Sequence, residues 1–368
     1  MNERKKLMAS CRQIIVKAGT RLLTDPEQIP VLIRGIARMR NAGYQLLLVS
    51  SGAVGTGLKL LGMEKRPRKL AEIQALAATG QGKLMSLYSE ACEKEGFLAA
   101  QLLLTRDDLR HRDRYLNVHN CIQSLWSHNI LPIVNENDSV SVDELKFSDN
   151  DILSGMLAAM TQSQLTIILT TESGLRRSEN GVLGERISVV PEVTAEVMDN
   201  AMGTDDPKFS VGGMTSKLNA AALATRAGCH LWIADGRDPE ILDKIMAGED
   251  VGTLFLPQAA KLHSRKLWID SFAEVSGRLV IDDGAAKALT QDGSSLLPSG
   301  VKRVIGIFDA GDTVEIATRD GILLGRGLVN FSSEESYKIR GLRAPEIAAI
   351  LGHDVPEEII HRDNLCLK

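Results

Sequence analysis

The sequence predicts a three-layer α/β/α sandwich with a mostly parallel sheet, followed by a small β-barrel-like domain. Short apolar runs alternate with longer helical patterns over the first two-thirds of the chain, as in parallel sheets covered on both faces. Near Ser276 the pattern changes to short strands and tight glycine-rich turns. The expected domains are therefore residues 10–270 and 276–360. At 368 residues, 44% hydrophobic and 24% charged, the chain has the composition of a soluble globular protein.

Each expected element of the first domain rests on a local pattern. Continuous apolar runs predict buried strands, and apolar residues at helical spacing predict the helices between them. The expected strands are 13–17, 45–49, 98–104, 130–134, 165–169 and 231–234. The expected helices are 30–42, 113–128, 152–160 and 216–227. Their βαβ connections should be right-handed.

The second domain is expected to be built from short strands. The segments GRLVIDDGA, VKRVIGIFDAGDTVEIATRDG and ILLGRGLVNFS alternate apolar and polar residues, and DAGD and RDG mark turns between them. The preceding stretch, KLHSRKLWIDSFAEV, lacks strong periodicity and is interpreted as the connection between the domains.

Charge and cysteine content exclude several classes of protein. A net charge of −4 argues against a general polyanion binder. The five cysteines are scattered without a CxxC pair, and the seven histidines have no metal-binding spacing, so neither a disulfide framework nor a metal site is expected. The basic start lacks the apolar stretch of a signal peptide, and no run of about 18 apolar residues predicts a membrane span. The expected location is the cytoplasm.

Two motifs follow the first two expected strands. Lys17 leaves the first strand before Gly19, where an ammonium group and backbone N–H groups can face a phosphate. Taken alone, this motif is better explained as a solvated lysine before a turn. The second strand is followed by SSGAVGTG, whose small residues let a ligand approach the backbone at a helix N-terminus. The alternative is a simple tight turn.

Two further motifs are polar or glycine-rich. NEND at 135–138 and SDND at 148–151 can bind an ammonium group and orient lysines, or they are surface loops in which Asp151 caps the next helix. VGGMTSK at 211–217 opens a helix and can hold a phosphate, with Lys217 supplying charge. The alternative there is a flexible hinge followed by a helix cap.

These motifs, in this order, resemble the amino-acid kinase superfamily, and within it the glutamate 5-kinase family. The similar stretches are IIVKAGT, LLLVSSGAVGTGLKLLG, QLLLTRDDLRHRDRYLNVHNCI, ILPIVNENDSVS, KFSDNDILSGMLA, VGGMTSKLNAA and VGTLFLP. The segment from GRLVIDDGAAKALT onward, with HRDN near the end, resembles the PUA domain that many members carry. The resemblance covers nearly the whole chain.

The resemblance implies an enzyme that transfers a phosphoryl group from MgATP to the side-chain carboxylate of L-glutamate, the first step of proline biosynthesis. It implies glutamate contacts from Ser51, Asn135, Asp138 and Asn150. It implies ATP contacts from Lys17, Thr170, Thr171, Val211, Gly212, Gly213, Met214, Thr215, Ser216 and Lys217. It also suggests a dimer or tetramer and feedback inhibition by proline.

The chemistry of such a transfer suits these residues. A carboxylate is already a nucleophile at neutral pH, so catalysis is mostly positioning and electrostatic stabilisation. The residues expected to act in catalysis are Lys17, Gly52, Asp149, Asp151 and Lys217. In this scheme the lysines neutralise phosphoryl charge, Gly52 donates a backbone N–H, and one of the two aspartates holds the lysines. Magnesium is expected to be coordinated mainly by the phosphates of ATP.

Three motifs depart from the family pattern on the nucleotide side, at four positions. Arg21 stands where serine usually follows KxGT, and Thr171 and Arg176 replace an acid and an aromatic residue. Val211 replaces the usual threonine of the glycine-rich loop. Nucleotide preference is therefore less firmly implied than the amino-acid substrate.

Three alternatives belong to other functional classes or substrates. An RNA-binding protein is suggested by the PUA-like segment, but residues 275–368 carry 11 Lys and Arg against 14 Asp and Glu, and phosphate neutralisation dominates such binding. A kinase of the same superfamily with another acid or a nucleoside monophosphate as substrate conflicts with the NEND and SDND pair. A regulatory protein with weak or no kinase activity conflicts with the retention of Lys17 and Lys217.

Overall fold

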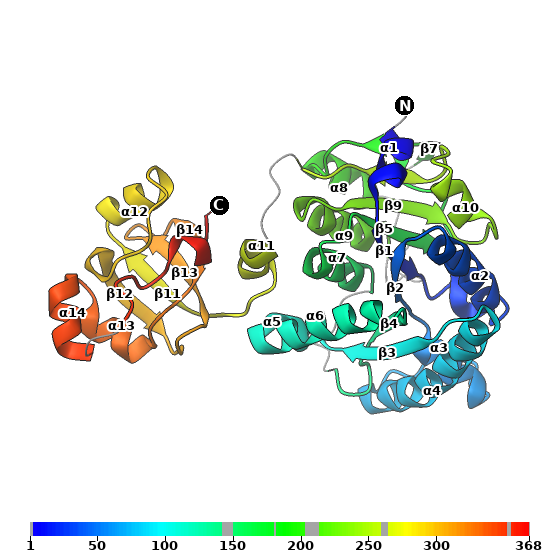
Figure 1. Cartoon of the computed structure of the whole chain (residues 1–368), viewed down its shortest axis with the longest axis horizontal. Coiled ribbons are helices and arrows are strands. Elements are labelled where there is room, and N and C mark those ends of the chain that lie inside the picture. Colours follow the sequence, from blue (N-terminus) through cyan, green and yellow to red (C-terminus); the bar gives the residue numbers. More distant parts are fainter. Residues whose placement is uncertain are drawn as a thin grey trace. The chain divides into compact units, whose positions relative to one another are not determined.

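The computed structural model describes residues 3–141, 150–179, 182–202, 213–258, 264–351 and 355–367. The chain divides into two compact units (Figure 1). The first comprises Met1–Leu109 and Asp113–Lys261, and the second comprises Arg110–Arg112 and Leu262–Lys368.

The first unit is built on an eight-stranded sheet in the order β3-β4-β2-β1-β5-β9-β10-β8. The strands are β1 (Gln13–Ala18), β2 (Gln45–Val49), β3 (Ala99–Leu104), β4 (Leu131–Glu136), β5 (Leu165–Thr170), β8 (Val189–Val190), β9 (His230–Asp235) and β10 (Thr253–Phe255). All neighbours run parallel except β9 and β10. The predicted α/β class with a mostly parallel sheet is confirmed. A separate hairpin is formed by β6 (Arg176–Glu179) and β7 (Val182–Arg186).

Helices cover both faces of this sheet. They are α1 (Glu3–Ser10), α2 (Gln28–Asn41), α3 (Ala53–Leu60), α4 (Leu70–Lys94), α5 (Arg106–Arg110), α6 (Arg112–Ser127), α7 (Asn150–Thr161), α8 (Ala195–Met202), α9 (Met214–Arg226) and α10 (Ile241–Met246). Figure 1 shows α7 and α9 on one side of the strands and α2 and α10 on the other. The core is aliphatic, as the low aromatic content predicts: Ile14, Val16, Leu46 and Leu48 are at most 1% exposed.

The second unit has a five-stranded sheet in the order β12-β11-β13-β14-β15. Its strands are β11 (Val275–Ile281), β12 (Val301–Gly306), β13 (Thr313–Thr318), β14 (Leu323–Leu328) and β15 (Leu365–Leu367). Its helices are α11 (Ser264–Ser271), α12 (Asp283–Thr290), α13 (Ser333–Ile339) and α14 (Ala344–Leu351). A separate small β domain is therefore confirmed, and within its sheet β11 and β13 pair in parallel.

Most of the segment interpreted as a connection belongs to the second unit and includes a helix, which corrects that interpretation. Helix α11 occupies Ser264–Ser271 and buries Trp268 and Ile269, which are 3% and 0% exposed. Two adjacent buried positions in a helix of eight residues do not produce a readable helical period, so the sequence does not indicate this helix.

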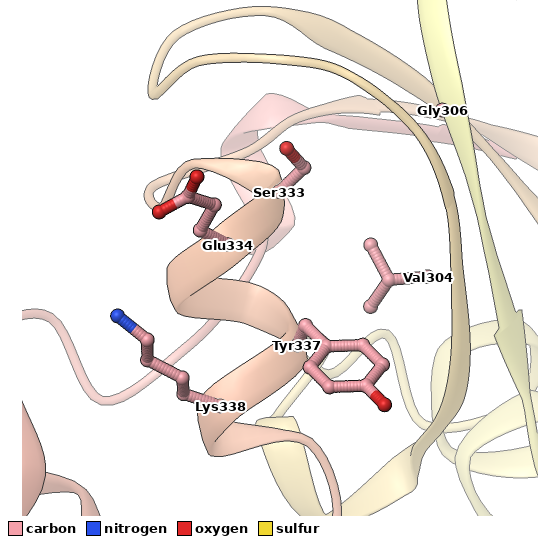
Figure 2. Close-up of a pocket in the computed structure, with 6 residues that line it drawn as sticks. All are labelled: Val304, Gly306, Ser333, Glu334, Tyr337 and Lys338. Carbon is pink, nitrogen blue, oxygen red and sulfur yellow. The ribbon is translucent and has the colours of Figure 1, made fainter.

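A groove of about 330 Å³ lies between β12 and α13 in this unit (Figure 2). It is lined by Val304, Gly306, Ser333, Glu334, Tyr337 and Lys338. None of these residues belongs to the motifs that predict chemistry, and all of those motifs lie in the first unit.

One prediction concerns the pH dependence of the first unit's stability. Burial lowers the pKa of His230, at the start of β9, below its ordinary value of 6.5. The unfolded chain therefore binds the proton more readily than the folded one, and stability should fall as the pH drops below about 6.5. Urea unfolding midpoints between pH 5 and 8 should show a smaller acid-side loss in a His230→Gln variant. An equal loss in both proteins would contradict this cause.

Candidate active site

Four neighbouring strands, in the order β4-β2-β1-β5, bring the predicted motifs to one edge of the sheet. Lys17 lies near the end of β1, Ser51 follows β2, Asn135 lies near the end of β4, and Thr170 ends β5. Parallel strands end at the same edge, and ligands of open α/β sheets bind outside these carboxyl ends. Residues far apart in the sequence thus meet where a ligand is expected.

Three buried charges form the centre of this edge. Lys17 Nζ lies 2.5 Å from Asp151 Oδ1, and Lys217 Nζ lies 2.9 Å from Asp151 Oδ2. Lys17 is 3% exposed, Lys217 is 6% exposed and Asp151 is 0% exposed. Buried charges are tolerated only when they are paired and hydrogen-bonded. Because two ammonium groups share one carboxylate, the three side chains together carry a positive charge that favours an anion.

The close packing of α7 against α9 explains why Lys217 reaches Asp151. Gly155 lies one turn after Asp151, and a Cβ atom at Gly155 would come within 3.0 Å of the carbonyl oxygen of Ala220. Ala220 in turn lies about one turn after Lys217 on α9. The helices therefore touch almost backbone to backbone beside the ion pair. Asp151 also sits in the first turn of α7, where the helix dipole favours a negative charge.

A chain of side-chain amides lies beside the charged centre. Asn150 Nδ2 lies 2.8 Å from the carbonyl oxygen of Ser50, 3.0 Å from Ser51 Oγ and 2.8 Å from Asn135 Oδ1. Asn135 Nδ2 donates in turn to Gln81 Oε1 at 2.8 Å. The NEND and SDND motifs, which were predicted to form one site, are thus in direct contact through Asn135 and Asn150.

Two buried oxygen atoms at this edge lack a hydrogen-bond partner within the described part of the chain. They are Asn150 Oδ1 and Ser216 Oγ. A buried unsatisfied acceptor costs about 1–3 kcal/mol, so native proteins usually satisfy such atoms. Asn150 directly precedes Asp151 and Ser216 directly precedes Lys217 in the sequence, so both atoms belong to the segments that a polar ligand at this edge would meet.

The SSGAVGTG motif forms the start of α3. Gly52 is the N-cap residue with φ 97°, a left-handed conformation that glycine adopts without a steric penalty. The first N–H groups of a helix have no partner within the helix, so α3 presents donors at the same edge. Gly57 of α3 and Gly80 of α4 allow a close crossing, since a Cβ atom at Gly80 would lie 1.9 Å from the carbonyl oxygen of Ala53.

The remaining predicted residues are placed as follows. Thr170 and Thr171 are half-buried at the end of β5, and Asp138 is half-buried in the turn after β4. Gly213 is the N-cap of α9, and Met214, Thr215 and Ser216 form its first turn before Lys217. Asp149, Val211 and Gly212 lie outside the described residues. Asp151, one of the two aspartates expected to hold the lysines, contacts both of them.

Sequence reasoning missed two residues on α4 that contact this site. Gln81 accepts a hydrogen bond from Asn135, and the buried Tyr88 hydroxyl accepts one from Ser50 Oγ at 3.0 Å. Burial raises the pKa of Tyr88 above its ordinary value, so the hydroxyl stays protonated. Their spacing of seven residues on one helix face was the only available signal.

Within the described ranges, no helix has both the length and the apolar character needed to span a bilayer.

Comparison with known proteins identifies the class of the chain. Residues 12–235 match the amino acid kinase family, and residues 277–351 match the PUA domain. A carbamate kinase from Giardia lamblia bound to AMP-PNP has a TM-score of 0.48 to this chain at 18% identity, covering 68% of this chain and 100% of that chain.

Curated relatives refine this class. A glutamate 5-kinase of Geobacter sulfurreducens is 42% identical over 370 residues, which is 98% of this chain and 99% of that protein. One of Thioalkalivibrio sulfidiphilus is 40% identical over 379 residues, which is 100% of both chains. The chain therefore belongs to the amino acid kinase family, within its glutamate 5-kinase branch, and carries a C-terminal PUA domain.

Proposed function

We propose that this enzyme transfers the γ-phosphoryl group of MgATP to the γ-carboxylate of L-glutamate, forming γ-glutamyl phosphate. The observation that carries the proposal is the Lys17–Asp151–Lys217 cluster beside the Asn135–Asn150 amide pair. The relatives named glutamate 5-kinase support the same substrate.

The two lysines stabilise the transferring group in this proposal. A carboxylate oxygen of glutamate attacks the γ-phosphorus while the bond to the β,γ-bridging oxygen breaks, and ADP leaves with that oxygen. No proton is transferred, so no general base is needed. Charge on the phosphoryl oxygens is met by Lys17 from β1 and Lys217 from α9, whose ammonium groups are already positioned by Asp151.

The amide pair and the α3 N-terminus hold the amino acid. Ser51, Asn135, Asp138 and Asn150 present oxygen and nitrogen atoms at this edge, and the unpartnered Asn150 Oδ1 can accept from an ammonium group. N–H groups at the start of α3, after Gly52, suit a carboxylate or phosphoryl oxygen.

Magnesium would enter as part of the nucleotide substrate. Both carboxylate oxygens of Asp151 already face lysine ammonium groups, so this aspartate is not a suitable ligand for the ion. Magnesium keeps several waters and is commonly held by substrate phosphates, which fits this arrangement.

The proposal is tested by ADP release from MgATP with and without L-glutamate, in the presence of hydroxylamine. Hydroxylamine converts an acyl phosphate into a stable hydroxamate. Glutamate-dependent ADP release with matching hydroxamate is the expected result. ADP release at the same rate with and without glutamate, and with no hydroxamate formed, would refute the proposal.

Replacing Lys217 by alanine should lower kcat by about 10²–10³-fold, because one of two cations facing the phosphoryl group is lost. Steady-state kinetics with saturating glutamate and ATP measure the change. Lys83→Ala, on the exposed side of α4, is the matched control and should keep full activity. Equal kcat values in Lys217→Ala and the wild type would remove Lys217 from the mechanism.

Several expectations stay predictions. They are a place in proline biosynthesis with feedback by proline, a dimer or tetramer, and a cytoplasmic location. RNA binding by the PUA domain is not favoured, because its segment carries more acidic than basic side chains.

A further inference from the structure

One face of α4 contacts the substrate side of the site through three polar side chains. Gln74, Gln81 and Tyr88 are spaced by seven residues, about two helical turns, and so lie on the same face. Their partners are the carbonyl oxygen of Ser141, the side chain of Asn135 and the hydroxyl of Ser50. The proposed mechanism assigns none of the three a role.

Two backbone groups fix which way the asparagine amides point. The backbone N–H of Glu136 lies 3.0 Å from the Asn135 side chain and can only donate, so the facing atom must be Oδ1. The carbonyl oxygen of Ser50 lies 2.8 Å from the Asn150 side chain and can only accept, so that facing atom must be Nδ2. These two contacts assign the orientation that both amides have in this structure.

Gln81 completes this chain at the Asn135 end. With Oδ1 of Asn135 turned to Glu136 and Asn150, its Nδ2 must donate, and the acceptor within 2.8 Å is Gln81 Oε1. Asn135 is only 2% exposed, so without Gln81 its amide nitrogen loses this acceptor in a buried position. The Asn135 amide would then lower its free energy by rotating toward another acceptor, and this rotation would break its hydrogen bond to Asn150.

The orientation of Asn150 decides which ligand the site favours. With Nδ2 held by Ser50 and Asn135, the Oδ1 atom faces away from them, is buried, and has no partner in the described part of the chain. A buried acceptor in this orientation favours a donor such as an ammonium group. If Asn150 reversed, it would present N–H groups and repel that cation.

We infer that Gln81 is a positioning residue that keeps Asn150 presenting an oxygen atom, and thereby selects substrates with an α-ammonium group. The inference rests on the proposed function. Gln81 itself does not touch the substrate in this account; it acts through Asn135. Tyr88 lies on the same face of α4 and accepts a hydrogen bond from Ser50, which is at the other end of this series of hydrogen bonds.

The test compares L-glutamate with glutarate, which is the same diacid without the amino group. The ratio of their kcat/KM values, from ADP release with hydroxylamine present, reports recognition of the ammonium group. Gln81→Met removes the acceptor at similar length, and the ratio should fall by about tenfold or more. Gln81→Glu keeps an acceptor and should retain most of the ratio. A structural defect alone would lower both kcat/KM values and leave the ratio unchanged.

Lys83→Met places the same side chain on the exposed side of α4 and is the matched control, with an unchanged ratio expected. Melting temperatures confirm folding, and Gln81→Leu replaces Gln81→Met if the latter does not fold. An unchanged ratio in the folded Gln81 variants, or an equal loss in Gln81→Glu, would overturn the role of Gln81 alone. A wild-type protein that does not turn over L-glutamate would instead refute the proposed function, and the role of Gln81 with it.

Discussion

Asparagine in place of Asp151 is expected to lower kcat/KM by at least about a hundredfold and to destabilise the fold by about 3–5 kcal/mol. Asp151 is fully buried and is the carboxylate shared by Lys17 and Lys217. A neutral amide keeps the volume but leaves two buried ammonium groups without their counter-charge. Their ammonium groups should then move toward solvent, and the phosphoryl group would lose both cations.

Urea unfolding and steady-state kinetics measure the two effects. Asp243→Asn is the matched control, because it makes the same chemical change in an ion pair with Arg38 whose side chains are 36% and 45% exposed. Exposed pairs contribute about 0–1 kcal/mol, so the control should be nearly as stable as the wild type and fully active. If the two variants behaved alike, the buried cluster would not have the role assigned to it.

Alanine at Gly80 is expected to destabilise the protein, by roughly 1–3 kcal/mol or more, and to reduce activity. Helix propensity alone predicts the opposite, a gain of about 1 kcal/mol for alanine in α4. The packing term should win, because the new Cβ atom would lie 1.9 Å from the Ala53 carbonyl oxygen and 2.4 Å from the Gly57 amide nitrogen. Relief requires α3 to move, and α3 begins beside Ser51 and Gly52.

Gly82→Ala separates these two effects. Gly82 lies on the same helix with no atom within 4 Å of the position of a new Cβ atom. It should therefore show the propensity gain, about 0.5–1 kcal/mol, with normal activity. Stabilisation by Gly80→Ala comparable with Gly82→Ala would show that α3 and α4 do not cross as closely as described.

The strands that carry the site could be predicted from the sequence because each is an apolar run with a polar motif at its end. Lys17 at the end of β1 and Asn135 at the end of β4 are examples, since parallel topology alone places both at one edge. The contact of Asp151 with both lysines could not be predicted from the sequence, because it depends on where α7 begins and on the close approach of α9.

Other features depend on contacts between distant segments. Gln81 meets a residue 54 positions away, and a half-exposed glutamine on a long helix has the pattern of a solvated side chain. Helix α1 was not predicted, because its stability comes from tertiary contacts. Arg4, 2% exposed, pairs with Asp250 at 2.9 Å and stacks over Trp232. The parallel pairing of β11 with β13 likewise leaves no local signal, because alternation shows a strand but not its neighbour.

The measurement that tests the central claim most directly follows oxygen from substrate to product. L-glutamate labelled with oxygen-18 in both γ-carboxylate oxygens is turned over with MgATP, and hydroxylamine cleaves the acyl phosphate at carbon. If the carboxylate is the nucleophile, each inorganic phosphate released carries one oxygen-18 atom, visible as an isotope shift in its phosphorus NMR signal. Phosphate without the label would mean that water attacks the nucleotide, and would contradict the assignment of this site as a carboxylate kinase.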